Sequence, residues 1–172
     1  MDPTTGHQFQ KTSINPIGKA VLVTGGAGYV GSHTCKFLSK NGFTPVVIDR
    51  DLRTKFKPVE FGPSFDINLP QEIERLDEII KRYNITSCIH FAGSASVSES
   101  VKNPSEYYKN NVIATVVLLD KLIECGIKTF VYSSSAATYG DPGINLCKES
   151  DWCKPISAYG ASKLMMEMIC KD

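Results

Sequence analysis

Short apolar runs alternate along the chain with segments in which apolar residues recur every three or four positions. The runs have the length of strands, and the recurring segments carry one apolar face, as amphipathic helices do. Strands that alternate with helices are typical of right-handed βαβ units and a parallel sheet covered on both faces. The pattern predicts strands over residues 20–24, 45–49, 64–66, 87–91 and 129–133.

Start and stop signals predict the helices between these strands. Asn68 and Gln71 have the spacing of a capping box, so we expect a helix over 69–83. Asn103 and Pro104 suit the cap and first turn of a helix that runs to 125, where Gly126 would stop it. Further helices are expected after the first strand, as far as residue 40, and over 159–171, whereas 134–157 should be irregular.

Length and composition are those of a single folded domain. The 172 residues include 42% apolar and 22% charged residues, which excludes disordered and fibrous proteins. A net charge of +1 creates no general field for nucleic acid or anionic membranes. The longest apolar stretch, 112–119, falls far short of the roughly 20 residues that span a bilayer. We expect a tail over 1–18, a domain over 19–172, and no nucleic-acid or membrane partner.

Cysteine and histidine usage narrows the chemistry. The six cysteines include no C-x-x-C pair, and several lie within apolar patterns, where Cys behaves as a small hydrophobic residue. Reduced thiols, and an N-terminus without an apolar signal-peptide core, indicate a cytoplasmic protein. The three histidines are scattered, so no metal site is expected.

The first candidate site is a glycine-rich turn. Residues 24–31 space glycines as G-x-x-G-x-x-G between a strand and a helix, which allows a pyrophosphate to approach the helix N-terminus. The second strand ends in Asp49, where a carboxylate can bind both ribose hydroxyls of adenosine. That carboxylate would repel the 2′-phosphate of NADP, so the pattern favours NAD. Arg50 and Arg53 follow closely and keep NADP as the alternative.

A second candidate site pairs a tyrosine with a lysine. Tyr159 and Lys163 are four positions apart, on one face of the last predicted helix. A neighbouring cation favours the ionised phenol, which can then accept a proton, although the spacing alone is common on solvated helices. Ser133 ends the fifth predicted strand and Ser135 follows it, at the sheet edge where ligands bind, and such serines can also simply form turns.

Five motifs in order resemble the extended short-chain dehydrogenase/reductase family, and within it the UDP-glucose 4-epimerases. They are TGGAGYVG (24–31), HFAG (90–93), ESVKNPSEYYKNNV (99–112), SSSAATYGDP (133–142) and YGASK (159–163). The resemblance, which runs from Lys19 to Asp172, implies a Rossmann-like, doubly wound α/β sheet that binds NAD. Here that sheet is expected to be incomplete, with about five strands, and to lack the C-terminal substrate domain.

The resemblance also implies roles for individual residues. The pyrophosphate would be held by Gly25, Gly28, Tyr29, Val30 and Gly31. Asp49 would bind the adenosine ribose, and Asp66 and Ile67 would flank the adenine. The path toward the nicotinamide would be lined by Phe91, Ala92, Gly93, Asn110 and Ser133. The catalytic residues would be Ser135, Tyr159 and Lys163, the last two also touching the cofactor.

The implied reaction interconverts UDP-glucose and UDP-galactose through a transient 4-keto sugar. Ala95 stands where the best-known epimerases carry a cofactor-contacting lysine. Ala136 and Ala137 stand where dehydratases and decarboxylases of the family carry acids, which argues against elimination chemistry. The alternatives are another NAD(P)-dependent sugar-nucleotide epimerase or reductase of this family, or a non-catalytic nucleotide-binding fragment.

Epimerases of this family are much longer, so the resemblance implies a fragment, and we expect little activity from this chain alone. The missing part would hold the UDP-sugar, whose identity this sequence does not specify. The predicted helices at 103–125 and 159–171 resemble the pair through which family members dimerise, so a homodimer is expected.

Overall fold

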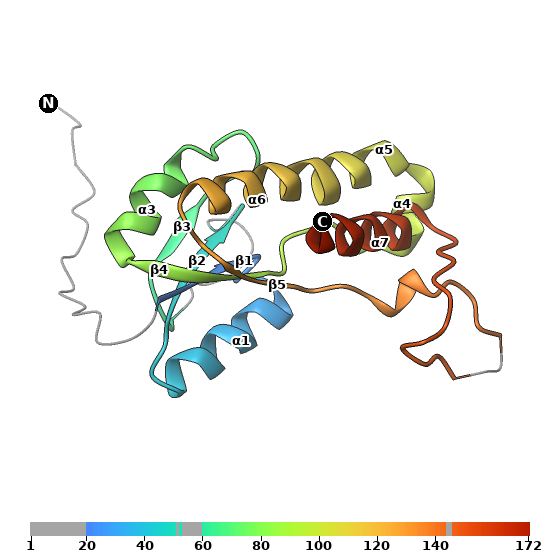
Figure 1. The fold of residues 1–172 in the computed structure, drawn as a ribbon, viewed down its shortest axis with the longest axis horizontal. Helices are drawn as coiled ribbons and strands as arrows, with labels where there is room; N and C mark the ends of the chain where they lie inside the picture. Colours follow the sequence, from blue (N-terminus) through green and yellow to red (C-terminus); the bar gives the residue numbers. More distant parts are fainter. Residues whose placement is uncertain (1–19, 51, 53–59, 144–145) are drawn as a thin grey trace, which may run out of the picture.

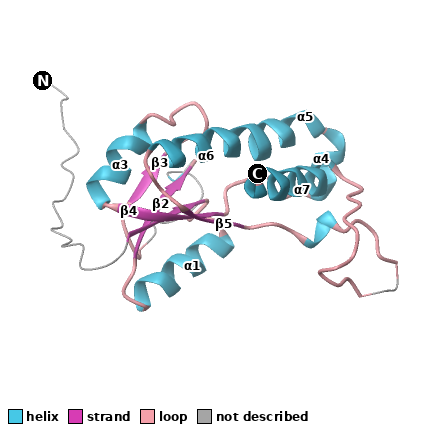
Figure 2. Cartoon of the chain, viewed as in Figure 1, coloured by secondary structure: helices cyan, strands magenta, loops and turns pink. Residues whose placement is uncertain are grey.

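The described part of the chain forms one parallel five-stranded sheet with helices on both faces (Figure 2). The computed structural model describes residues 20–50, 52, 60–143 and 146–172, so the expected tail lies outside the described residues. The strands are β1 (Ala20–Thr24), β2 (Thr44–Asp49), β3 (Ser64–Asp66), β4 (Ile85–His90) and β5 (Thr129–Tyr132). Their order, β3-β2-β1-β4-β5, reverses direction at β1, which confirms the Rossmann-like sheet.

The helices cover the two faces of this sheet unequally. In Figure 1, α1 (Tyr29–Lys40) lies on one face, and α3 (Arg75–Tyr83) and α6 (Ala114–Glu124) lie on the other. Beyond the sheet, α7 (Ala158–Lys171) packs against α4 (Val97–Lys102) and α5 (Pro104–Tyr107). Two shorter segments complete the described fold: the π-helical η1 (Tyr108–Ile113) and the 3-10 helix η2 (Ala136–Thr138).

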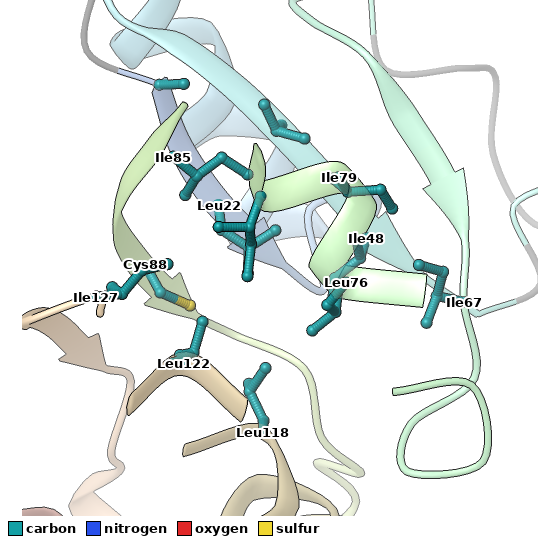
Figure 3. Close-up of a cluster of buried hydrophobic side chains, with 13 residues drawn as sticks. Leu22, Ile48, Ile67, Leu76, Ile79, Ile85, Cys88, Leu118, Leu122 and Ile127 are labelled. Carbon is teal, nitrogen blue, oxygen red and sulfur yellow. The ribbon is translucent and has the colours of Figure 1, made fainter. Parts of the chain in front are cut away.

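Apolar side chains of the central strand divide between the two faces. All five residues of β1 are buried, as expected for a strand covered on both sides. Leu22 points into the larger cluster, between the sheet and the α3 and α6 helices, where Figure 3 shows it with Leu118 and Leu122. Val21 and Val23 pack toward α1 with Cys35. The sheet is therefore held by two separate apolar layers.

The helix predicted over 69–83 begins later than expected, at Arg75. Asn68 does not open a helix; its backbone N–H donates instead to the Glu72 carboxylate at 2.8 Å. That carboxylate also pairs with Arg75 at 2.6 Å. Residues 69–74 form turns before α3, and Pro70 disfavours helical backbone at Leu69. The prediction was wrong over this stretch, where i→i+3 bonds such as that from the Ile73 N–H to the Pro70 carbonyl at 3.2 Å replace those of an α-helix.

The helix predicted over 103–125 has the expected extent but not the expected regularity. It consists of α5, the wider π-helical turn of η1, and α6. The preceding segment, where no helix or strand was predicted, contains α4, which Ser96 caps by accepting a hydrogen bond from the Glu99 N–H at 3.3 Å. Within the long segment predicted to be irregular, η2 is capped in the same way by Ser135.

Substitution of Leu118 tests the larger apolar layer. Leu118 is fully buried in it, so Leu118→Ala should lower the free energy of unfolding by about 2–5 kcal/mol. Ile123 lies on the same helix but is 70% exposed, and Ile123→Ala should change that free energy by less than about 0.5 kcal/mol. Urea titration followed by circular dichroism measures both. Equal losses for the two variants would contradict the described packing of α6.

Candidate functional site

The turn between β1 and α1 leaves no room for a side chain at Gly25 or Gly31. Gly25 has a φ of +67°, and a Cβ on it would lie 2.6 Å from the backbone nitrogen of Ala92. A Cβ on Gly31 would overlap the carbonyl oxygen of Gly25. Glycine is therefore required at both positions, and its absence of a side chain brings the N-terminus of α1 against the ends of β1 and β4.

The N-terminus of α1 is suited to an anion. Its cap, Gly28, has no side chain to bond the first N–H groups, and the first turn contains no acidic residue. The N–H groups and the positive end of the helix dipole therefore face outward toward a ligand. Tyr29 and Val30, the first two residues of this helix, are 80% and 56% exposed. This arrangement is typical of a pyrophosphate site.

A pocket opens at the carboxyl ends of β1, β2 and β4, where the strand order reverses. Open α/β sheets bind their ligands at this point. Asp49 ends β2, and its Oδ2 accepts a hydrogen bond from the Ala27 N–H at 3.0 Å, so this carboxylate braces the glycine turn. The lining residues are Thr24, Gly25, Gly28, Ile48, Asp49, Arg50, Ile67, Asn68, Leu69, His90, Phe91, Ala92, Gly93, Asn110 and Ala114.

Most of the predicted cofactor residues meet in this pocket. Those that line it are Gly25, Gly28, Asp49, Ile67, Phe91, Ala92, Gly93 and Asn110. The predicted cofactor residues that do not line it are Tyr29, Val30, Gly31, Asp66, Ser133, Tyr159 and Lys163. Asp66 lines a second cavity together with Arg75 and Arg82. The next residue, Ile67, is buried and lines the first pocket. The Ile67 N–H donates to the Asp49 carbonyl at 2.9 Å, which continues the pairing of β3 with β2.

Lys163 is held beside the pair of aromatic rings from Tyr132 and Tyr159. Its Nζ donates to the Ser133 carbonyl at 2.9 Å and lies 4.9 Å from the Tyr132 ring centroid and 5.9 Å from that of Tyr159. Lys163 is buried, and this burial lowers the pKa of its ammonium. The structure therefore places Lys163 of α7 beside Tyr159 of the same helix and beside Ser133, which directly follows β5.

Ser135 reaches the same region through η2. Its Oγ accepts a hydrogen bond from the Ala137 N–H at 3.2 Å. A Cβ on Gly160 would overlap the Ala137 carbonyl oxygen, so η2 and the first turn of α7 are in direct backbone contact. Ser135 and Tyr159 are thus close along the chain to the two residues, Ala137 and Gly160, that make this contact.

A chain of buried hydrogen bonds, which the sequence did not predict, starts beneath the pocket. His90 Nδ1 lies 2.6 Å from Thr24 Oγ1, and His90 Nε2 lies 2.9 Å from Thr115 Oγ1. The Thr115 hydroxyl donates its one proton to the Asn111 carbonyl at 2.7 Å. It therefore accepts from Nε2–H of His90, and Nδ1 accepts from the Thr24 hydroxyl. The neighbouring bonds fix one tautomer of the neutral ring.

Asn111 extends this chain to α7. Its Oδ1 accepts from the Ser94 N–H at 2.8 Å, and its Nδ2 donates to the Ser94 carbonyl at 2.9 Å and to Ser162 Oγ at 3.2 Å. The Ser162 hydroxyl donates to the Tyr159 carbonyl at 2.7 Å. The network thus links the floor of the pocket to the helix that carries Tyr159 and Lys163. Polar residues at core positions of an apolar strand or helix are the sequence signal for such a network.

The surroundings of His90 keep its ring uncharged. Burial, together with a smaller effect of the positive charge of Lys163, lowers the pKa of His90 to about 3. The ring stacks on Tyr132 at a centroid distance of 6.0 Å, and the Lys163 ammonium lies over the same tyrosine. A protonated imidazole would therefore lose a hydrogen-bond acceptor and repel the lysine.

Comparison with known proteins assigns this arrangement to a family. Residues 21–172 match the NAD dependent epimerase/dehydratase family. The chain belongs to this family. The membership confirms the resemblance seen in the five motifs. It also agrees with a pocket whose glycine turn and strand-ending acid suit a dinucleotide.

Relatives of this epimerase/dehydratase chain include UDP-glucose 4-epimerases. That of Rhizobium leguminosarum bv. trifolii is 41% identical over 155 residues, covering 90% of this chain and 47% of the relative. That of Halalkalibacterium halodurans is 44% identical over 148 residues, covering 86% and 44%. The crystal structure of UDP-glucose 4-epimerase from Brucella ovis in complex with NAD matches with a TM-score of 0.82 at 39% identity, covering 90% and 47%. The chain spans about half the length of the curated relatives it matches.

Two negative findings concern the described part of this family member. Its His, Cys, Asp and Glu residues form no group of three or more that could hold a metal ion. None of its helices combines the length and apolar character needed to cross a membrane.

The neutral state of His90 predicts a pH dependence of stability. The unfolded chain binds a proton near the ordinary pKa of 6.5, whereas the folded ring does so near 3. The stabilisation is therefore complete above the ordinary value and is lost as the pH falls toward the folded one, by up to about 1.4 kcal/mol per pH unit. Urea titrations between about pH 5 and 7 measure this slope.

His90→Gln should flatten that slope, whatever its cost in absolute stability. His33→Gln, which removes an exposed histidine of α1, is the matched control. Identical slopes for the wild type and His90→Gln would contradict a buried neutral imidazole.

Proposed function

We propose that this chain binds NAD in the pocket at the ends of β1, β2 and β4 and forms the cofactor-binding half of a UDP-hexose 4-epimerase. The reaction is the interconversion of UDP-glucose and UDP-galactose, the substrate being a small-molecule UDP-sugar. One observation carries the proposal: the glycine turn and Asp49 line a pocket at the carboxyl ends of the parallel strands, and Lys163 donates to the Ser133 carbonyl at the same end of β5. The relatives named UDP-glucose 4-epimerase support the choice of reaction.

The residues of the pocket fit a dinucleotide. Gly25 and Gly31 bring the backbone of the turn close to the N-terminus of α1, because no side chain separates them. The pyrophosphate would bind at this helix N-terminus, where the free N–H groups favour an anion. Asp49 offers carboxylate acceptors to ribose hydroxyls, and Ile67 and Leu69 offer apolar surface to the adenine. Gly28 and the exposed first turn of α1 leave the approach open.

When bound, NAD would supply reversible oxidation of the sugar carbon C4. Tyr159 would take up the proton of the C4 hydroxyl and return it later. Lys163, whose ammonium lies 5.9 Å from the Tyr159 ring centroid, would stabilise the ionised phenol. Ser135 would donate a hydrogen bond to the same hydroxyl and orient it. The Ser133 carbonyl holds the lysine in place for this role.

The loop after β5 favours epimerisation over elimination. Elimination of a sugar hydroxyl needs an acid to protonate the leaving group. Ala136 and Ala137 form η2 beside Ser135, and neither side chain can donate a proton. This supports an epimerase rather than a dehydratase.

We also infer a homodimer and a cytoplasmic location. The packed elements η1 and α7 both expose apolar side chains: Ile113 is 53% exposed, and Met165 and Met168 are 43% and 61% exposed. Such a shared apolar surface suits a second copy of the chain. All six cysteines are free, which fits a reducing compartment.

Nucleotide titration tests the cofactor assignment. The chain should bind NAD more tightly than NADP, and Asp49→Ala should weaken NAD by about 10- to 100-fold because hydrogen bonds to a charged acceptor are lost. NADP binding should be unchanged or improved, since the carboxylate no longer repels the 2′-phosphate. Asp120→Ala, on the outer side of α6, is the control carboxylate. Isothermal calorimetry measures all four affinities, and tighter NADP binding by the wild type would refute the assignment.

Light scattering tests the homodimer. The wild type should have the mass of two chains, and Met168→Asp should give monomers because it places a charge in the apolar surface. Phe37→Asp alters an equally exposed residue of α1, on another face, and should leave the dimer intact. A wild type that stays monomeric at the highest accessible concentration would argue against dimerisation.

A further inference from the structure

Arg50 crosses the mouth of the pocket. It follows Asp49 at the end of β2, and its side chain is exposed. Its Nη1 donates to Asn110 Oδ1 at 3.1 Å. Asn110 belongs to η1 and also donates to Ser94 Oγ at 3.1 Å, so it lies on the β4 side of the pocket. The Arg50 guanidinium therefore extends from the Asp49 end of the pocket, where the adenosine ribose would bind, to the side formed by the end of β4.

The charges around the pocket are sparse. Among the described residues that line it, Arg50 is the only lysine or arginine, and Asp49 is the only acid. His90 also lines the pocket but is neutral, because burial lowers its pKa to about 3. A dinucleotide brings a negative charge on each phosphate of its bridge. The N-terminus of α1 provides only about half an elementary positive charge to balance them.

We propose that Arg50 is a phosphate-binding residue of the cofactor site, exchanging its bond to Asn110 for a bond to the diphosphate bridge. The proposal rests on the NAD binding proposed above. The present acceptor is a neutral amide, whereas a phosphate gives a charge-assisted and often bidentate bond of about twice the strength. Because the side chain is exposed, the exchange moves only a surface arginine and no part of the core.

The same guanidinium chemistry would suit the 2′-phosphate of NADP. The position of the side chain favours the bridge instead. The guanidinium reaches past Asp49 to Asn110, toward Gly93 and Ser94, and so away from the ribose hydroxyls at Asp49. Asp49 itself would repel a phosphate placed on that ribose.

A ligand series separates these sources of phosphate. Adenosine, ADP, NAD and NADP are titrated by calorimetry into the wild type, Arg50→Gln and Arg50→Lys. Arg50→Gln should weaken ADP and NAD by about tenfold or more and change adenosine by less than about twofold. Arg50→Lys should keep part of the affinity, since an ammonium retains the charge without the planar fork. The control is Arg82→Gln, an exposed arginine of α3 that stacks on Tyr83 and does not line the pocket.

The outcomes are distinct. If Arg50→Gln binds ADP and NAD as tightly as the wild type does, the inference is wrong while the proposed NAD site stands. Equal weakening of adenosine and ADP would overturn it in favour of an effect on pocket shape. A loss confined to NADP would overturn it in favour of 2′-phosphate recognition. A wild type that binds none of the four nucleotides would refute both the NAD site and the role of Arg50. Matching urea transitions for all variants verify that each one folds.

Discussion

The close approach of backbone segments at the β1–α1 turn is the constraint on which the rest of the structure depends. At Gly25, a side chain would collide with the backbone of Ala92, and at Gly31 it would collide with the turn itself. At Gly26, it would meet the side chain of Val47 in β2. The turn is thus packed against both neighbours of β1. Only this packing puts the N-terminus of α1 at the crevice where the strand order reverses.

A second constraint couples the pocket to the helix that carries the candidate catalytic pair. Buried polar groups are costly unless they are bonded, and here each one is bonded to the next. The His90 ring joins β1 to α6, and Asn111 joins η1 to the Ser94 loop and to Ser162 of α7. The same helix buries Lys163 against Tyr132 and the Ser133 carbonyl. The nucleotide pocket and the tyrosine–lysine pair therefore share one rigid support.

The sequence predicted best what is encoded locally. The strands follow apolar runs, and the glycine spacing and Asp49 are close enough along the chain to be recognised as one motif. The start of α3 was predicted too early, because i→i+3 backbone bonds form turns in the residues before it. The short α4 was missed because its six residues, mostly small and polar, carry too little periodicity to stand out.

The buried hydrogen-bond network could not be predicted from the sequence, because the residues that form it lie far apart along the chain. Thr24 and His90 are separated by 66 positions, and Asn111 and Ser162 by 51. The place of His90 at the end of an apolar strand marks it as a core residue, but its partners are not visible in the local sequence. Asp66 shows a different case: the family resemblance implies that it flanks the adenine, yet its side chain lines a different cavity. The position of a residue at a strand end does not by itself determine which cavity its side chain lines.

Hydrogen–deuterium exchange with and without NAD tests the central claim most directly: that the glycine turn and the end of β4 form one nucleotide site. With NAD, exchange should slow in peptides that cover residues 25–31 and 91–93, and should be unchanged in α3, behind the sheet. Unchanged exchange in both of the first two segments at saturating NAD, or slowing confined to α3, would contradict the account.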